Sequence, residues 1–154
     1  MNQKESLVYV TLVSATPEKM WEALTDPAFI AQYWYGRKHE STWQPGATIT
    51  SSSPEGELEW TGQILESDPP RRLSYTFQPV DQKESPSRVT FDIEQIGGEV
   101  GPQGNAIRLT TVHDSFAPDS EVLRRVSKGW PGILSGLKTL LETGRPLGVT
   151  SICD

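Results

Sequence analysis

Hydrophobic and polar residues alternate with a period of two in several segments of the chain, the pattern of strands that bury one face. The clearest alternating sets are Leu73, Tyr75 and Phe77; Val89, Phe91 and Ile93; and Ile107, Leu109, Thr111 and His113. Together with an opening run rich in β-branched residues, the pattern predicts strands over 7–13, 39–44, 47–52, 57–66, 71–79, 86–96 and 105–115. Turn residues such as QPG, PEG and DPP separate the later runs, so we expect adjacent runs to pair as antiparallel hairpins.

Two short helices are predicted between the first two strands. The segment TPEKMWEAL begins at Thr16, which can cap a helix, and Pro17 suits the first helical position. Asp26 and Pro27 repeat this signal, so a second helix is predicted over 28–34.

The longest helix is predicted over 119–143, and Asp119 or Ser120 opens it. At 100° per residue its apolar positions fall within about 120°. These positions are Val122, Val126, Trp130, Ile133, Leu137, Leu140 and Leu141. Because a stripe of this length needs a surface to lie on, the helix is expected to pack on the antiparallel sheet.

Three residues in the middle of this helix weaken it. Pro131 cannot donate a backbone hydrogen bond, and Gly129 and Gly132 lie on either side of it, so a bend is predicted near residue 130. A bent helix over a curved sheet cannot fill the concave space uniformly, which predicts a partly open interior. The alternative is that the small residues merely allow close approach of neighbouring backbones.

Composition narrows the class of protein. The 154 residues fit one domain spanning 1–154, and 20 acidic against 14 basic residues give a net charge of −6. An acidic surface repels phosphate backbones and anionic membranes, so neither nucleic acid nor a membrane is an expected partner. The basic pairs Arg71–Arg72 and Arg124–Arg125 are interpreted as solvated faces. The polar start MNQKES lacks the apolar core of a signal peptide, and a cytoplasmic location is expected.

The residues that carry common chemistries are few. Cys153 is the only cysteine and cannot form an internal disulfide. His39 and His113 are the only histidines, and no spacing of ligands suggests a metal, so no cofactor is predicted. The sequence contains no G-x-S-x-G elbow and no glycine-rich phosphate loop. Enzymes with such motifs are therefore disfavoured, and no catalytic residue is assigned.

His113 has two readings. It shares the strand parity of Ile107 and Leu109, which puts it on the inner face of the sheet, where it could donate to a ligand or act as an acid or base with Tyr75. The alternative is a buried histidine whose nitrogens are satisfied by neighbouring groups. Asp114 has the opposite parity, so the two adjacent residues do not form a dyad.

Three stretches carry a resemblance to a known family. They are TPEKMWEALTDPAFIAQYW (16–34), GQILESDPPRRLSYTF (62–77) and GWPGILSGLKTLLETG (129–144). Their order resembles the START-like, or SRPBCC, superfamily, and more specifically the homologues of the activator of the heat-shock-protein-90 ATPase. The resemblance implies an α+β helix-grip fold, in which a seven-stranded curved antiparallel sheet wraps around a long C-terminal helix and encloses a hydrophobic cavity. It implies no shared catalytic motif.

The predicted function is the binding of a small hydrophobic molecule in that cavity. The residues expected to line it are Trp43, Trp60, Tyr75, Phe77, Phe91, His113, Trp130 and Leu137. Aromatic side chains suit a flat apolar ligand through offset stacking, although each is also a normal core residue. Two alternatives are an enzyme similar to polyketide cyclases, which the superfamily contains, and a protein-interaction domain related to co-chaperones. A homodimer is left open.

Overall fold

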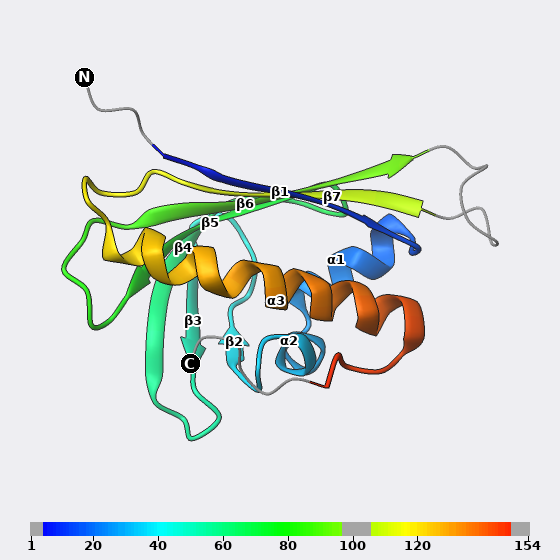
Figure 1. Ribbon diagram of the computed structural model, residues 1–154, viewed down its shortest axis with the longest axis horizontal. Helices are drawn as coiled ribbons and strands as arrows, with labels where there is room; N and C mark the ends of the chain where they lie inside the picture. Colours follow the sequence, from blue (N-terminus) through cyan, green and yellow to red (C-terminus); the bar gives the residue numbers. More distant parts are fainter. Residues whose placement is uncertain (1–4, 97–105, 149–154) are drawn as a thin grey trace.

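A curved antiparallel sheet wraps around one long helix in the computed structural model, which describes residues 5–96 and 106–148 (Figure 1). The elements in chain order are β1 (Leu7–Val13), α1 (Pro17–Thr25), α2 (Pro27–Tyr33), β2 (Lys38–Glu40), β3 (Thr48–Ser52), β4 (Leu58–Asp68), β5 (Arg72–Pro79), β6 (Ser87–Ile96), β7 (Ala106–Asp114) and α3 (Glu121–Thr143). The predicted α+β helix-grip fold, with two short helices after the first strand, is confirmed.

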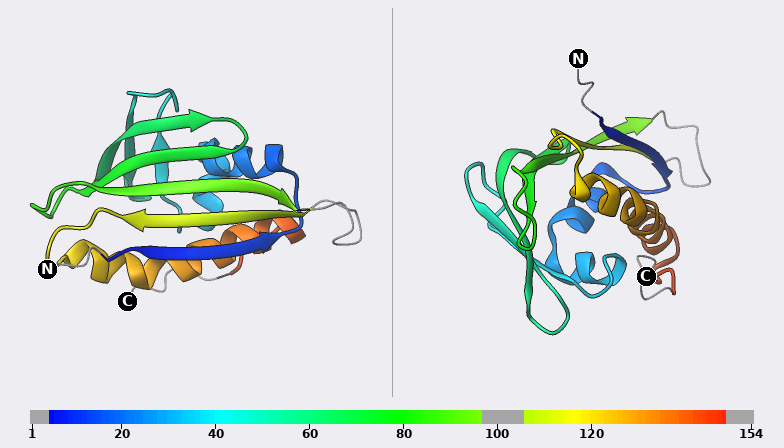
Figure 2. Two further views of the ribbon diagram at one scale, coloured as in Figure 1. Left: turned by 90° about the horizontal axis from the view of Figure 1, so that it is seen from above. Right: turned by 60° about the vertical axis from the view of Figure 1, so that its left-hand side comes forward.

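The sheet has seven strands in the order β1-β7-β6-β5-β4-β3-β2, and all neighbouring pairs are antiparallel. Strands that follow one another from β2 to β7 are neighbours, as the turn residues between them predict. The exception is β1, which pairs with β7 and places Leu7 opposite His113. Figure 2 shows the sheet curling so that α3 lies along its concave side.

The helices begin close to the residues predicted from capping. The Thr16 hydroxyl accepts a hydrogen bond from the Lys19 amide at 3.1 Å, and an Asp26 carboxylate oxygen accepts one from the Ala28 amide at 2.9 Å. Ser120 caps α3 by accepting from the Leu123 amide at 3.0 Å. These side chains satisfy amides that the first turn leaves without helical partners.

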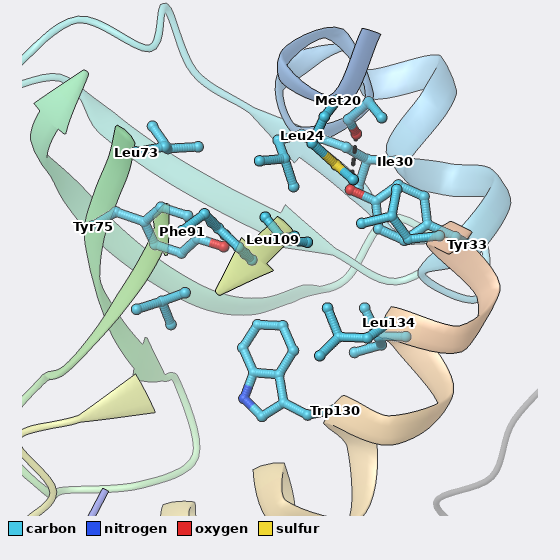
Figure 3. Close-up of a cluster of buried hydrophobic side chains, with 14 of the residues drawn as sticks. Met20, Leu24, Ile30, Tyr33, Leu73, Tyr75, Phe91, Leu109, Trp130 and Leu134 are labelled. Atoms are coloured by element: carbon cyan, nitrogen blue, oxygen red, sulfur yellow. Dashed lines mark hydrogen bonds between the residues drawn. The ribbon is translucent and has the colours of Figure 1, made fainter. Parts of the chain in front are cut away.

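The core lies between the apolar stripe of α3 and the inner face of the sheet. The buried residues of α3 are Val122, Gly129, Trp130, Ile133, Leu134, Gly136, Leu137 and Leu140, which follows the predicted stripe closely. Figure 3 shows Trp130 and Leu134 directed toward residues of the sheet, with α1 and α2 closing one end of the cluster. The helix continues without interruption through Pro131, which is exposed.

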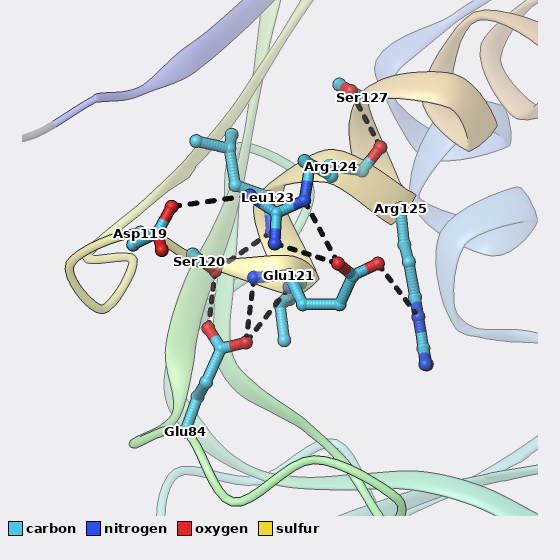
Figure 4. A network of polar contacts seen from close by, with 9 residues as sticks. Glu84, Asp119, Ser120, Glu121, Leu123, Arg124, Arg125 and Ser127 are labelled. Atoms are coloured by element: carbon cyan, nitrogen blue, oxygen red, sulfur yellow. Dashed lines mark hydrogen bonds and ion pairs between the residues drawn. The ribbon is translucent and has the colours of Figure 1, made fainter.

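A carboxylate from a distant loop also binds the first turn of α3. Glu84, between β5 and β6, accepts hydrogen bonds from the Ser120 hydroxyl at 2.5 Å and from the amides of Glu121 and Val122 at 2.9 and 3.2 Å (Figure 4). Partial burial raises the pKa of Glu84, but these hydrogen bonds outweigh it and leave the pKa below its usual value. The contact fixes the β5–β6 loop against the start of α3.

One predicted strand is shorter than expected. The run over 39–44 predicted a longer strand, whereas β2 ends at Glu40. The reason is a turn that the alternation did not reveal. Trp43 has a positive φ of 62°, and its amide donates to the Ser41 hydroxyl at 2.9 Å. Such a local side-chain bond competes with strand pairing.

Glycines at two positions predict opposite responses to alanine. At Gly136 an added Cβ would meet atoms of Tyr33 at 3.5–3.8 Å, which is ordinary contact, and alanine favours a helix. We expect Gly136→Ala to raise the free energy of unfolding by about 0.5–1 kcal/mol. At Gly62 the Cβ would lie 1.8 Å from the Thr76 carbonyl oxygen, so Gly62→Ala should cost roughly 1–3 kcal/mol.

Urea unfolding of both variants beside the unsubstituted protein measures these changes. Loss of stability in Gly136→Ala would mean that α2 and α3 pack more closely than their backbones indicate. An unchanged Gly62→Ala would contradict the close approach of β4 and β5.

Candidate functional site

A pocket of about 450 Å³ lies between the first half of α3, the facing ends of β4 and β5, and the segment that joins α2 to β2. Its aromatic wall is formed by Trp34, Trp60, Phe77 and Trp130. Its aliphatic lining includes Val122, Val126 and Ile133 of α3. Leu58 and Val80 also line it and are 46% and 55% exposed, so the pocket reaches the surface at their side. The volume falls in the range of sites for small organic molecules.

The aromatic wall is held by contacts between rings. Trp60 and Phe77 lie 4.6 Å apart between ring centroids, and Trp34 meets Trp130 edge to face at 5.5 Å. Behind the wall, Tyr75 stacks on Trp60 at 5.7 Å with only 10° between the ring planes. Because neighbouring rings contact each member of this wall, the packing of the protein itself sets its shape.

Two ion pairs lie at the edge of the pocket. Arg37 contacts Glu59 through two nitrogens, with Nε at 3.0 Å and Nη2 at 3.4 Å from the carboxylate, and its Nη1 donates to the Tyr35 carbonyl. Arg125 contacts Asp81 through Nη1 alone, at 3.0 and 3.1 Å from the two carboxylate oxygens. The edge therefore carries two positive and two negative side chains around an apolar interior.

Three of the eight predicted ligand-binding residues line this pocket: Trp60, Phe77 and Trp130. Tyr75, Phe91, His113 and Leu137 are almost completely buried in the packing behind it. Trp43 is only partly buried and packs against the core from the segment between β2 and β3. The interior between sheet and helix is thus largely filled by these side chains, and the open space lies toward the start of α3.

His113 belongs to a chain of hydrogen bonds behind the wall. The Trp130 indole N–H donates to its Nδ1 at 3.0 Å, so in the neutral ring the proton is on Nε2. This nitrogen donates to the Ser87 hydroxyl at 2.7 Å, and that hydroxyl donates to the Phe77 carbonyl at 3.3 Å. Trp130 and Phe77, at the two ends of this series of hydrogen bonds, both line the pocket. His113 therefore helps to orient the pocket wall without lining the pocket itself.

Burial keeps this histidine neutral. It lowers the pKa of His113 to about 3, although the nearby Asp114 opposes the shift. Asp114 itself pairs with Arg88 at 2.9 Å on the outer face, as its parity predicted. Burial also raises the pKa of Tyr75, which leaves its hydroxyl protonated at neutral pH. Of the two readings of His113, the structure supports the buried histidine with satisfied nitrogens.

His39 is a second buried histidine near the wall. Its ring lies 4.5 Å from Trp34 and 5.1 Å from Trp60, and burial lowers its pKa to about 3. Its Nε2 has no hydrogen-bond partner among the described residues, and neither has the hydroxyl of Ser51, directly opposite on β3. Within the same residues, no group of three or more side chains is placed to hold a metal ion. Cys153 lies outside the described residues.

Sequence reasoning missed the charged edge of the pocket. Arg125 belongs to a pair interpreted as a solvated face, and Trp34 is the last residue of the predicted second helix, with no binding role assigned to it. Arg37, Glu59 and Asp81 carry no motif. The one usable signal is spacing, because Arg125 falls three residues after Val122 and one before Val126, at the border of the apolar stripe.

Comparison with known proteins places the chain in a family. The model of the family described as "Activator of Hsp90 ATPase homolog 1-like protein" matches residues 14–142. No curated protein matches the chain in sequence. No described helix has both the length and the apolar character needed to cross a membrane.

Solved structures share the fold. Protein MLL2253 from Mesorhizobium loti is 27% identical, with a TM-score of 0.70 over 89% of this chain and 96% of that protein. The Aha1 dimer from Colwellia psychrerythraea is 16% identical, with a TM-score of 0.71 over 91% and 98%. CalU16 from Micromonospora echinospora is 20% identical, with a TM-score of 0.70 over 92% and 78%. The last two identities support the fold alone.

The two buried histidines predict how stability depends on pH. In the unfolded chain each titrates near the ordinary pKa of 6.5, and in the folded protein near 3, so only the unfolded state gains protons between these values. Stability is therefore complete above pH 6.5 and falls as the pH is lowered, by about 1.4 kcal/mol per pH unit for each histidine. Glu84 also has a lowered pKa in the folded protein, but its ordinary pKa is 4.5. Its protonation in the unfolded chain therefore reduces stability only below about that pH.

We expect His113→Gln to reduce the slope between pH 6.5 and 5 by about half, because glutamine can keep both hydrogen bonds without titrating. Urea unfolding at several pH values measures the slope. Glu55→Gln, at an exposed turn, is the control and should leave it unchanged. An equal slope in His113→Gln and the unsubstituted protein would show that His113 is not held neutral by folding.

Proposed function

The chain belongs to the family of activator of Hsp90 ATPase homolog 1-like proteins, and within this family we propose that it binds a small hydrophobic molecule between α3 and the sheet. The observation that supports the proposal is the pocket of about 450 Å³ with Trp34, Trp60, Phe77 and Trp130 in its wall. Rings fixed in advance offer flat apolar surfaces at little cost in ordering on binding. The proposed ligand is therefore an aromatic or otherwise rigid apolar compound.

A binding role accounts for the site better than an enzyme similar to polyketide cyclases. General acid–base catalysis needs a titrating group within reach of the bound molecule. His113 and Tyr75 are the candidates from the sequence, and both are buried behind the wall with pKa values shifted away from neutrality. The charged groups that do line the pocket are held in ion pairs at its edge.

Protein interaction is a second candidate, supported by one feature of the outer face. Val8, Val10 and Leu12 of β1 are 57%, 59% and 52% exposed and form an apolar row along an edge strand. Rows of this kind mark surfaces that other proteins cover. A related structure is that of a dimer, and a homodimer or a co-chaperone-like contact is the corresponding proposal here. For either role the proposed location is the cytoplasm.

Ligand binding is tested with a neutral fluorescent probe, N-phenylnaphthylamine. We expect its emission to rise on binding, and the melting temperature of the protein to rise with probe concentration. At a hundredfold excess over the dissociation constant the stabilisation is about 2.7 kcal/mol. Val126→Trp should abolish both effects, because the larger side chain fills the pocket that Val126 lines. Val126 suits this better than Leu137, which lies in the core.

Lys128→Trp is the matched control, since position 128 is exposed on the same helix and does not line the pocket. It should bind the probe as the unsubstituted protein does. Equal binding by Val126→Trp and Lys128→Trp would place the probe elsewhere and remove the support for this pocket. Light scattering of Val10→Lys would test the second candidate, which predicts a smaller assembly than the unsubstituted protein forms.

A further inference from the structure

The two arginines at the edge of the pocket differ in how completely they are used. Arg37 is engaged through all three of its side-chain nitrogens, with Glu59 and with the Tyr35 carbonyl. Arg125 contacts Asp81 through Nη1 alone, and its Nε lies 3.8 Å from Glu121. No hydrogen bond from Arg125 Nη2 is found within the described part of the chain. Arg125 therefore keeps N–H donors for a further acceptor.

The pair between Arg125 and Asp81 is also the more replaceable of the two. Its side chains are 46% and 59% exposed, against 30% and 36% for Arg37 and Glu59. Exposed pairs contribute little to stability, and contact through one nitrogen is weaker than the parallel contact through two that a guanidinium offers a carboxylate. A second carboxylate could therefore displace Asp81 and form the two-nitrogen contact that Asp81 does not make.

The position of Arg125 connects this charge to the apolar interior. It is the neighbour of Val126 and lies three residues after Val122, and all three line the pocket. Figure 4 shows Glu121 between Arg124 and Arg125, and Glu121 is held closely by Arg124, at 2.8 Å. The acid nearest along the helix is thus already engaged, which leaves Asp81 as the main competitor for Arg125.

From these contacts we infer that the pocket takes an amphipathic carboxylate. Its apolar body lies against the aromatic wall, and its carboxylate binds Arg125 at the edge in place of Asp81. This inference rests on the proposed function, and it adds the chemical class of the ligand and the residue that selects it. Arg37 remains paired with Glu59.

A matched pair of ligands tests the inference. Naphthylacetate and naphthylethanol have similar apolar bodies, but only the first carries a charge at neutral pH. Each is titrated against bound N-phenylnaphthylamine, and the displacement gives its affinity. We expect the acid to bind about tenfold more tightly than the alcohol, the difference typical of one charge-assisted contact with two nitrogens.

Two substitutions should move this preference in opposite directions. Arg125→Gln should reduce the affinity for naphthylacetate about tenfold and leave naphthylethanol unchanged. Asp81→Asn should raise the affinity for the acid several-fold, because the competing carboxylate is gone. Lys128→Gln removes the same charge from the exposed side of α3 and is the control, with no effect expected on either ligand.

Each outcome separates this inference from the proposed function. Equal binding of acid and alcohol, with no response to Arg125→Gln, would overturn the carboxylate assignment while the binding role stands. If Lys128→Gln lowered the affinity for naphthylacetate as much as Arg125→Gln does, the preference would come from the overall charge of the protein, and the assignment to Arg125 would also be overturned. Failure of N-phenylnaphthylamine to bind any form would overturn the proposed function itself.

Discussion

Burial of the apolar stripe of α3 against the concave side of the sheet is the interaction on which the rest of the structure depends. The helix lies along the concave side of the sheet (Figure 2) and supplies Trp130, Leu134, Leu137 and Leu140 to the core. Its start is fixed by Ser120 and by the carboxylate of Glu84 from the β5–β6 loop. With the helix held in this way, the sheet can curve around it without leaving its inner face in water.

The pocket follows from an asymmetry along this helix. The second half of α3 packs beside α1 and α2, where Gly136 approaches Tyr33 (Figure 1). Among the described residues, the first half faces the ends of β4 and β5 instead. Space that side chains fill in one half therefore remains open in the other. Small residues on α3 serve close packing at Gly136 and line the pocket at Gly129.

The polar groups close to this apolar site differ in charge according to where they lie. Those behind the wall are neutral, and the hydrogen bonds of His113 to Trp130 and Ser87 give the indole a single orientation. The charged side chains among the described residues that line the pocket lie at its edge, where water lowers the free-energy cost of keeping them charged. From the same arrangement we expect stability to depend on pH through His39 and His113, and Arg125 is the charged group that the proposed ligand would meet.

The sequence by itself determined the elements and their order. The alternation of buried and exposed residues in β5, β6 and β7 can be read within each strand alone. The caps at Thr16, Asp26 and Ser120 likewise act within one turn of a helix. The placement of His113 on the inner face of the sheet, and of Asp114 on its outer face, also follows from strand parity. The early end of β2 was not predicted, because Trp43 takes a left-handed conformation that no local sequence pattern indicates.

Only the tertiary structure decided which inward residues reach open space. Tyr75, Phe77, Phe91 and His113 all face inward by parity, yet Phe77 lines the pocket while the others are covered by neighbouring rings. That difference depends on where α1, α2 and α3 cross the sheet, which is a property of distant segments. The pairing of Arg125 with Asp81, 44 positions apart, has the same origin. The direction of a side chain is a local property, whereas its burial and its contact partners are set by the packing of the whole chain.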